Sequence, residues 1–250
     1  MLERNKSESV KTAARTLDLF EVFAQARSPL SLTDLANRLQ APISSCHALV
    51  RTLQSRGYLY VLEKRKRVYP TKRMLQLVEA ISQHDPLLET VAPVLTKLRD
   101  SLGETVILGN RLEECVVYIE VVEGTHTVRY AAKPGEAKPL HSSAIGKAML
   151  SGLGPAALRK LLERLSLTRV TANTITDIDA LIADIEEGRR RGIFVTRGEN
   201  VEDVGALAIR REINGEPFGL AIAGPVERIN RNFDAYCREL IRQGDALGDL

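Results

Sequence analysis

The sequence predicts an α+β protein with a small, mainly helical N-terminal domain and a larger domain that combines helices with an antiparallel sheet. Helical periodicity dominates the N-terminal part, and after Gly103 short β-rich runs and helices are mixed. The charge is also unequally divided. Residues 1–72 hold 13 Lys and Arg against 6 Asp and Glu, net +7, whereas residues 73–250 hold 22 against 26, net −4. This division favours a nucleic-acid-binding module joined to a domain that does not contact nucleic acid, although a solvated basic surface would have the same composition.

The composition of the 250-residue chain, of which 44% is hydrophobic, is that of a globular protein. Its longest stretches without acidic residues, Lys or Arg fall far short of the roughly 20 apolar residues of a membrane-spanning helix. The first six residues, four of which are polar, lack the apolar core of a secretory signal. We therefore expect a cytoplasmic protein that does not span a membrane.

Three helices are predicted in the first domain. Apolar residues recur at intervals of three and four from Val10 to Ala26. A second helix, at about residues 31–39, starts at Ser31 in an arrangement close to a capping box. A third helix extends from Ile43 to Arg56 and is stopped by Gly57. Two helices joined by so short a turn form a helix-turn-helix, whose second helix can lie in the major groove of DNA.

Several polar residues of the helix-turn-helix lie off its apolar stripe and could contact base edges or phosphates. The candidates in the third helix and at the start of the second are Ser44, Ser45, His47, Arg51, Thr52, Ser31 and Thr33. Hydroxyls at a helix start are also good caps, so this ordinary role stays open for the serines.

A cationic hairpin is predicted next. Two strand-like runs, Gly57–Leu62 and Arg67–Pro70, flank a short polar turn. Four successive cations occupy this turn and the start of the second run, namely Lys64, Arg65, Lys66 and Arg67. Their mutual repulsion would be neutralised by phosphates, and such contacts give a salt-dependent affinity. The hairpin therefore completes a winged helix-turn-helix as a DNA-binding candidate.

The rest of the chain is predicted to contain a linker helix and an α+β domain. We place the domains at residues 1–71 and 85–250, with the linker at 72–84. Turns are expected at Asn110 and Gly124. The predicted helices are Thr71–Ser82, Pro86–Ser101, Ala144–Leu150, Pro155–Leu165, Asp177–Arg191 and Val226–Leu247. The predicted strands are Thr105–Leu108, Cys115–Val122, Thr127–Ala132, Ile193–Thr196, Gly205–Ile213 and Phe218–Ala223.

The chain resembles the IclR family of bacterial transcription regulators over residues 10 to about 245. In the first domain the resemblance is carried by the runs Ser31–Ala36, Pro42–Leu53 and Arg56–Leu59. Downstream it is carried by Gly103–Val106, Pro139–Leu150, Thr174–Asp177, Arg190–Ile193 and Ala223–Pro225, in the order typical of the family. The chain departs from the family pattern at Ile43, at Ala48 and at Ala208–Arg211.

The resemblance implies a GAF-like effector-binding domain after the linker helix. It also implies a homodimer, or a dimer of dimers, that binds double-stranded operator DNA under the control of a small organic molecule. We expect a regulator of a catabolic or metabolic operon, with a repressor favoured over an activator. Two rival functions remain open: a small-molecule enzyme that its basic domain recruits to DNA, and an interaction adaptor that carries a winged helix.

The resemblance also places effector contacts near seven residues, namely Tyr130, Ala144, Ile145, Ala206, Ala208, Ala221 and Ala223. Period-two alternation puts Arg210 on the same face of its strand as Ala206 and Ala208. A guanidinium at the rim of an alanine-lined cavity would hold a carboxylate. We therefore predict a small organic acid as effector, with aromatic acids among the candidates, held by Arg210 and by Arg129. The alternative is that Arg210 pairs with Glu212 or Glu199.

Catalytic, nucleotide and metal sites are not indicated. A phosphate loop would need a glycine where this chain has His141, and a hydroxyl residue where it has Ala148. No GxSxG motif surrounds Ser142 or Ser143. The four histidines show no metal-ligand spacing. We expect no enzyme activity, no cofactor and no metal.

Overall fold

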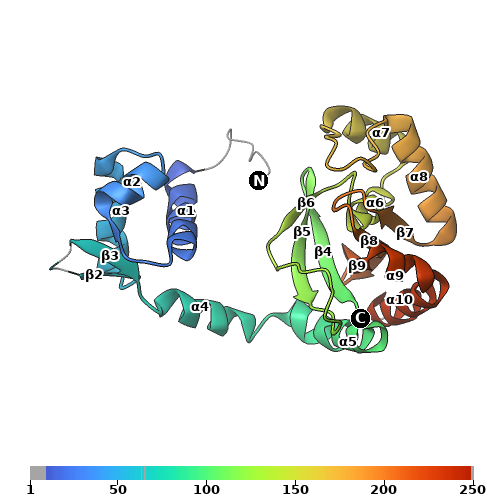
Figure 1. The fold of residues 1–250 in the computed structure, drawn as a ribbon, viewed down its shortest axis with the longest axis horizontal. Coiled ribbons are helices and arrows are strands. Elements are labelled where there is room, and N and C mark those ends of the chain that lie inside the picture. The colour runs from blue at the N-terminus through green and yellow to red at the C-terminus, as the bar shows by residue number, and fades with distance from the viewer. Residues whose placement is uncertain (1–9, 63, 65, 249–250) are drawn as a thin grey trace. The chain divides into compact units, whose positions relative to one another are not determined.

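The computed structural model describes residues 10–62, 64 and 66–248, which form two compact units. The first unit extends to Asp85 and the second begins at Pro86 (Figure 1). The positions expected for domain boundaries, at residues 71 and 84, stay predictions. Within the described ranges, no helix combines the length and apolar character that a bilayer crossing requires.

The first unit packs three helices against a small antiparallel sheet of order β1-β3-β2 (Figure 1). Its core is formed by apolar residues that include Leu19, Leu35 and Leu53. The elements are α1 (Lys11–Ala26), β1 (Leu30–Ser31), α2 (Leu32–Arg38), α3 (Ile43–Ser55), β2 (Leu59–Leu62), β3 (Arg67–Pro70) and α4 (Arg73–Ser82). This is the predicted winged helix-turn-helix followed by a helix. The two-residue strand β1 was not predicted, since a pairing so short leaves no periodicity in the sequence.

The second unit is built on an antiparallel sheet of order β6-β5-β4-β9-β8-β7. Its strands are β4 (Thr105–Leu112), β5 (Cys115–Val122), β6 (Ala137–Pro139), β7 (Phe194–Arg197), β8 (Val204–Ile213) and β9 (Glu216–Pro225). Its helices are α5 (Pro86–Leu102), α6 (Ala144–Leu150), α7 (Pro155–Arg164), α8 (Ile178–Arg191), α9 (Val226–Arg231) and α10 (Phe233–Gly248). The α+β fold class, with a helix-turn-helix domain and a curled antiparallel-sheet domain, is confirmed.

Each face of the large sheet is covered by its own hydrophobic core. Side chains of α5 and α10, such as Leu95 and Leu240, pack on one face together with Leu207 and Ile209 of β8. On the opposite face, α6, α7 and α8 pack against Ala208 and its neighbours. The alternation along β8 therefore directs leucine and isoleucine to one core and small alanines to the other, where space remains for a cavity.

Three sequence predictions about elements in this unit are wrong. Residues 127–132 form no strand, because the carbonyls of Val128 and Tyr130 accept hydrogen bonds from the side chains of Arg228 and Thr105 rather than from a neighbouring strand. Asn110 lies within β4 and not in a turn. The last helix is two helices, separated at Asn232.

Candidate DNA-binding surface and effector cavity

Helix α3 presents a polar, solvent-exposed face. Its predicted DNA-contacting residues Ser44, Ser45, His47, Arg51 and Thr52 are all exposed, whereas Cys46, Val50 and Leu53 of the same helix are buried. The period of 3.6 residues separates these two faces. The exposed face offers hydroxyl, imidazole and guanidinium donors, which suit the edges of bases and phosphate oxygens.

Ser31 and Thr33 have different environments. The Ser31 hydroxyl accepts from the Asp34 amide at 3.1 Å and the Ser31 amide donates to Oδ2 of Asp34 at 3.1 Å, which makes a capping box at the start of α2. The Ser31 hydroxyl also donates to Oδ2 of Asp34 at 2.8 Å. These hydrogen bonds hold the pKa of the Asp34 carboxyl below its ordinary value. Ser31 therefore caps α2, while Thr33 lies exposed beside it.

The hairpin between β2 and β3 carries exposed cations. Lys64 and Lys66 are exposed at the tip, and Arg65 lies outside the described residues. Arg67 is exposed too, but its Nη1 donates to the carbonyl of Pro29 at 2.9 Å. The structure therefore brings two lysines to the tip and ties Arg67 to the segment that precedes α2.

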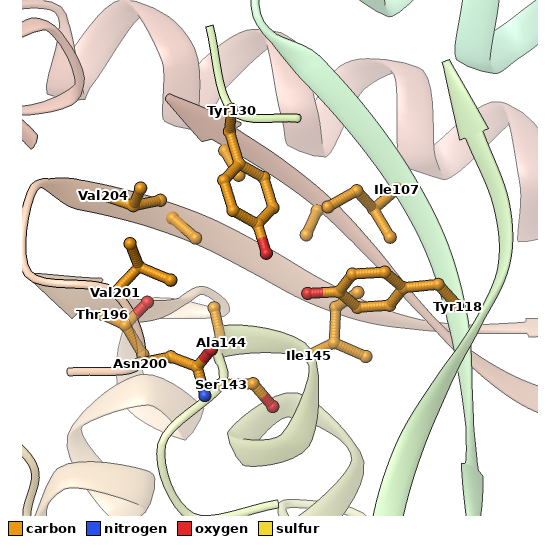
Figure 2. A pocket seen from close by; sticks show the side chains of 13 residues that line it. Ile107, Tyr118, Tyr130, Ser143, Ala144, Ile145, Thr196, Asn200, Val201 and Val204 are labelled. Carbon is orange, nitrogen blue, oxygen red and sulfur yellow. The ribbon is translucent and has the colours of Figure 1, made fainter. Parts of the chain in front are cut away.

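A cavity lies on the alanine-bearing face of the large sheet and has an empty volume of about 430 Å³, open mouth included. Its floor comes from β4, β8 and β9, and its sides come from the start of α6 and the segment 196–204 (Figure 2). The residues that line it are Ile107, Tyr118, Tyr130, Ser143, Ala144, Ile145, Thr196, Asn200, Val201, Val204, Ala206, Ala221 and Ala223. None of these described lining residues is charged.

Two tyrosine hydroxyls point into this cavity (Figure 2). Tyr118 comes from β5. Burial is the main cause that raises the pKa of its hydroxyl, and the proximity of Tyr130 is the second cause. Tyr118 therefore stays a neutral hydrogen-bond donor at physiological pH. Tyr130 is held over the cavity by Thr105, whose hydroxyl donates to the Tyr130 carbonyl at 2.6 Å.

Six of the predicted effector-contacting residues line the cavity: Tyr130, Ala144, Ile145, Ala206, Ala221 and Ala223. The structure does not bring Ala208, Arg129 or Arg210 to its wall. Ala208 is fully buried in the core under α6. Arg129 is exposed and pairs with Glu123, with an Nη2–Oε2 distance of 2.9 Å.

The expectation that Arg210 lies at the rim of this cavity is wrong. Arg210 does follow Ala206 and Ala208 along one face of β8, but four residues of strand separate it from Ala206 by roughly 13 Å. Helix α6 covers the intervening sheet, since Ile145 packs directly on Gly219, the partner of Arg210 in the ladder. The Arg210 guanidinium pairs with Glu212 at 3.0 Å and lines a separate open depression.

Several lining residues were not predicted. Tyr118 and Asn200 supply most of the missed polar chemistry, and the Asn200 amide donates to the Ser142 hydroxyl at 3.0 Å. The one signal available for Tyr118 was a tyrosine in a predicted strand that is apolar apart from Tyr118 and Glu120. The segment around Asn200 carries no periodicity, because its position is fixed by hydrogen bonds from Thr171 and Thr174 to the carbonyls of Gly198 and Glu199.

The motif from His141 to Lys147 has structural roles. His141 is buried, its Nε2 lies 3.0 Å from the Thr168 carbonyl, and burial lowers the pKa of its imidazole. Ser143 caps α6 by accepting from the Gly146 amide at 3.1 Å. Lys147 is fully buried and its Nζ lies 2.7 Å from carboxylate oxygens of both Asp184 and Glu199. The Lys147 contacts fix α6 against α8 and the segment that follows β7.

An exposed donor-bearing helix with a cationic wing, followed by a sheet domain with a small cavity, defines the class of ligand-responsive DNA-binding proteins. Two family models agree with this architecture. The model described as IclR helix-turn-helix domain matches residues 12–63, and the model described as Bacterial transcriptional regulator IclR C-terminal matches residues 78–246. The chain belongs to the IclR family of DNA-binding transcriptional regulators.

Named relatives are similar along most of the chain. The Transcriptional repressor IclR of Escherichia coli is 30% identical over 225 residues, which cover 88% of this chain and 82% of the relative. The Probable transcriptional regulator SauR of Cupriavidus necator is 31% identical over 229 residues, which cover 91% of this chain and 90% of the relative. Both names describe regulators of transcription.

Solved structures share the fold. The IclR protein of Thermotoga maritima superposes with a TM-score of 0.79 at 22% identity, over 96% of this chain and 98% of that chain. An IclR homolog from Microbacterium hydrocarbonoxydans, solved in complex with 4-hydroxybenzoate, superposes with a TM-score of 0.78 at 21% identity, over 95% of this chain and 98% of that chain.

Proposed function

We propose that this protein is a repressor whose affinity for its operator changes when a small organic acid binds the cavity of the second unit. The observation that carries this proposal is the cavity itself, which is floored by alanines and receives two tyrosine hydroxyls. An apolar pocket with a few converging polar groups is typical of small-molecule sites. The relative from Escherichia coli named as a repressor, and the homolog solved with an aromatic acid, support the choice of repression and of acids.

Contact with DNA is proposed for the exposed candidates of α3, for Thr33 and for the wing. Hydroxyls and an imidazole near the start of α3 would meet base edges, while Arg51 and the wing lysines would meet phosphates. Ser31 would act indirectly, because its hydroxyl is occupied in the cap of α2. A regulator of this class binds chromosomal DNA, so we propose a cytoplasmic location. We also propose that the protein has no catalytic activity.

The test is a binding titration on intergenic DNA that flanks the gene. Fluorescence anisotropy with labelled fragments would measure operator affinity alone and in the presence of single organic acids, 4-hydroxybenzoate among them. We expect binding to one palindromic fragment, with an affinity that at least one acid changes by fivefold or more. Affinity for no fragment, or an operator affinity that no acid alters, would contradict the proposal. The double variant Ser44→Ala with Arg51→Ala should weaken specific binding more than binding to unrelated DNA.

We propose that the protein acts as a homodimer through the apolar side of α4. None of the ten residues of this helix, all of which the structure describes, is buried. Its exposed apolar residues are Leu75, Leu77, Val78 and Ile81. An isolated helix of this length is marginal in water, and such a patch indicates a protein interface. A measurement of the oligomeric state will also show whether two dimers associate into a tetramer.

Light scattering after size exclusion measures the oligomeric state. We expect the natural protein to be a dimer or a tetramer, and we expect Ile81→Asp to shift it toward the monomer. Gln76→Asp is the matched control, since it places the same charge at an exposed polar position of the same helix. A monomeric natural protein, or an Ile81→Asp variant with an unchanged mass, would exclude α4 as the interface.

A further inference from the structure

Lys138 shares the cavity face of the large sheet. It lies in β6 and pairs with Val116 of β5 in the antiparallel ladder. Residues directly opposite one another in such a ladder point to the same side of the sheet. Val116 is buried in the core that also contains Tyr118, two residues further along β5. The side chain of Lys138 therefore projects toward the same side as Tyr118.

The contacts of Lys138 place a positive charge beside Tyr118 and Tyr130. Its side chain is 19% exposed, and its ammonium lies 5.8 Å from the ring centre of Tyr118 and 3.0 Å from Oε2 of Glu136. Burial by itself would lower the pKa of this ammonium, but the interactions with Tyr130 and Glu136 outweigh burial and raise it. Lys138 is therefore a permanent cation at neutral pH, next to the two hydroxyls that point into the cavity.

No described charged residue lines the cavity, and the other cations near this face do not lie over a ring that lines it, as Lys138 does. Arg129 pairs with Glu123, and Arg210 pairs with Glu212 beyond α6. Lys147 is fully buried between Asp184 and Glu199, so two carboxylates already balance its charge. Lys138 also pairs with a carboxylate, Glu136, whose side chain is 36% exposed. Its position over the Tyr118 ring distinguishes it from Arg129 and Arg210.

We propose that Lys138 is a specificity-determining residue of the cavity, and that it selects ligands with a carboxylate that accepts hydrogen bonds from the hydroxyls of Tyr118 and Tyr130. An anion in a largely apolar cavity needs both hydrogen bonds and charge compensation. The tyrosines supply the hydrogen bonds and Lys138 supplies the compensating charge. This inference rests on the proposed function, since it concerns the same cavity, and it names the group that distinguishes acids from neutral analogues.

The experiment compares carboxylates with their matched carboxamides. The probes are 4-hydroxybenzoate with 4-hydroxybenzamide, benzoate with benzamide, and pyruvate with pyruvamide. Binding to the full-length protein is measured by thermal shift and calorimetry without DNA. The variants are Lys138→Met, which keeps an unbranched side chain of similar length without the charge, and Lys138→Arg, which keeps the charge. Arg210→Met is the matched control, because it removes a cation that lines a separate depression without Tyr118 or Tyr130.

We expect the natural protein to bind at least one acid tenfold or more tighter than its amide. Lys138→Met should weaken binding of that acid about tenfold and leave binding of the amide unchanged. Lys138→Arg and Arg210→Met should retain the preference for the acid. If Lys138→Met does not fold, Tyr130→Phe provides the second variant, with the same loss of preference expected from the missing hydroxyl.

Three outcomes would overturn this inference: an acid preference that survives Lys138→Met, amides that bind as tightly as acids, or no binding of any acid in the panel. A different result would contradict the proposed function alone. In that case binding of an acid to the cavity depends on Lys138, but the acid does not change the affinity of the protein for its operator.

Discussion

At the scale of single residues, Glu104 is a fully buried carboxylate that lies immediately before β4. Both of its carboxylate oxygens accept from the Arg228 guanidinium of α9, with an Nη2–Oε2 distance of 2.7 Å. The Tyr236 hydroxyl donates to Oε1 of Glu104 at 3.2 Å. Arg228 also donates to the Val128 carbonyl at 2.9 Å. One arginine therefore ties β4, α9 and the loop before Tyr130 together.

We expect Arg228→Met to destabilise the second unit by about 3 kcal/mol, because it leaves a buried carboxylate without its charge partner. Urea unfolding followed by circular dichroism measures this change. Arg159→Met is the matched control, since Arg159 pairs with Asp179 on an exposed surface and its loss should barely move the midpoint. Equal midpoints for the two variants would show that the buried pair does not carry this stability.

Glu239 should give a pH-dependent contribution to stability. Its hydrogen bonds with Arg242, followed by the smaller effect of Gln243, lower its pKa from 4.5 to about 2. A carboxyl with a lowered pKa stabilises the fold above its unfolded pKa, and that contribution is lost as the pH falls through the folded pKa. Glu239→Gln should therefore be less stable than the natural protein at pH 7. The difference in urea midpoints should shrink between pH 4.5 and 2, and a constant difference would contradict the prediction.

The sequence could predict some site residues and not others. The family resemblance predicted effector contacts at Ala206, Ala221 and Ala223, and these residues do line the cavity. Period-two alternation in β8 put Ala206, Ala208 and Arg210 on one face. The same alternation could not tell that Arg210 lies beyond α6, because the position of a helix on a sheet depends on tertiary packing. Lys138 was missed for a related reason, since its partners become neighbours only when β6 pairs with β5.

At the scale of elements, helices were more predictable than strands. A helix such as α3 contains its own hydrogen bonds and shows its buried face as a repeat of 3.6 residues. A strand depends on a partner that is distant in sequence. Residues 127–132 are rich in β-forming residues but have no strand partner, whereas the edge strand β6 forms in Ala137–Pro139, which has no β-branched or aromatic residue. Strand propensity describes a side chain's fit to a sheet and does not identify the neighbour.

The wing gives a prediction at this scale. Each lysine that contacts a phosphate releases a condensed counterion, so replacing Lys64 and Lys66 by alanine should reduce the slope of log affinity against log salt by up to about 2. Anisotropy titrations between low and physiological salt measure the slope. The matched control removes two positive charges from exposed positions of the second unit, Lys97→Ala with Lys160→Ala. An equal decrease in slope for both double variants would show that net charge, and not the wing, controls the affinity.

At the scale of the whole molecule, charge and chemistry are divided between the two units. The net charge is +6 over residues 1–85, with 14 Lys and Arg against 8 Asp and Glu, and −3 over residues 86–250, with 21 against 24, so the DNA-binding candidates and the cavity belong to units of opposite charge. The acidic unit does not favour phosphate contact, which leaves DNA binding to the first unit. Regulation then requires that the ligand bind the DNA-competent and DNA-incompetent arrangements with different affinities.

This requirement is reciprocal, which gives a prediction for the complete protein. If an acid lowers operator affinity by some factor, saturating operator DNA must lower the affinity for that acid by the same factor, typically between about 5 and 150. Calorimetric titration of the acid into the free protein and into the protein–operator complex measures the second factor, and anisotropy measures the first. A fragment with a scrambled sequence is the control and should leave the affinity for the acid unchanged. Unequal factors would mean that the acid and the operator do not act on one shared equilibrium, for example because the acid changes the oligomeric state.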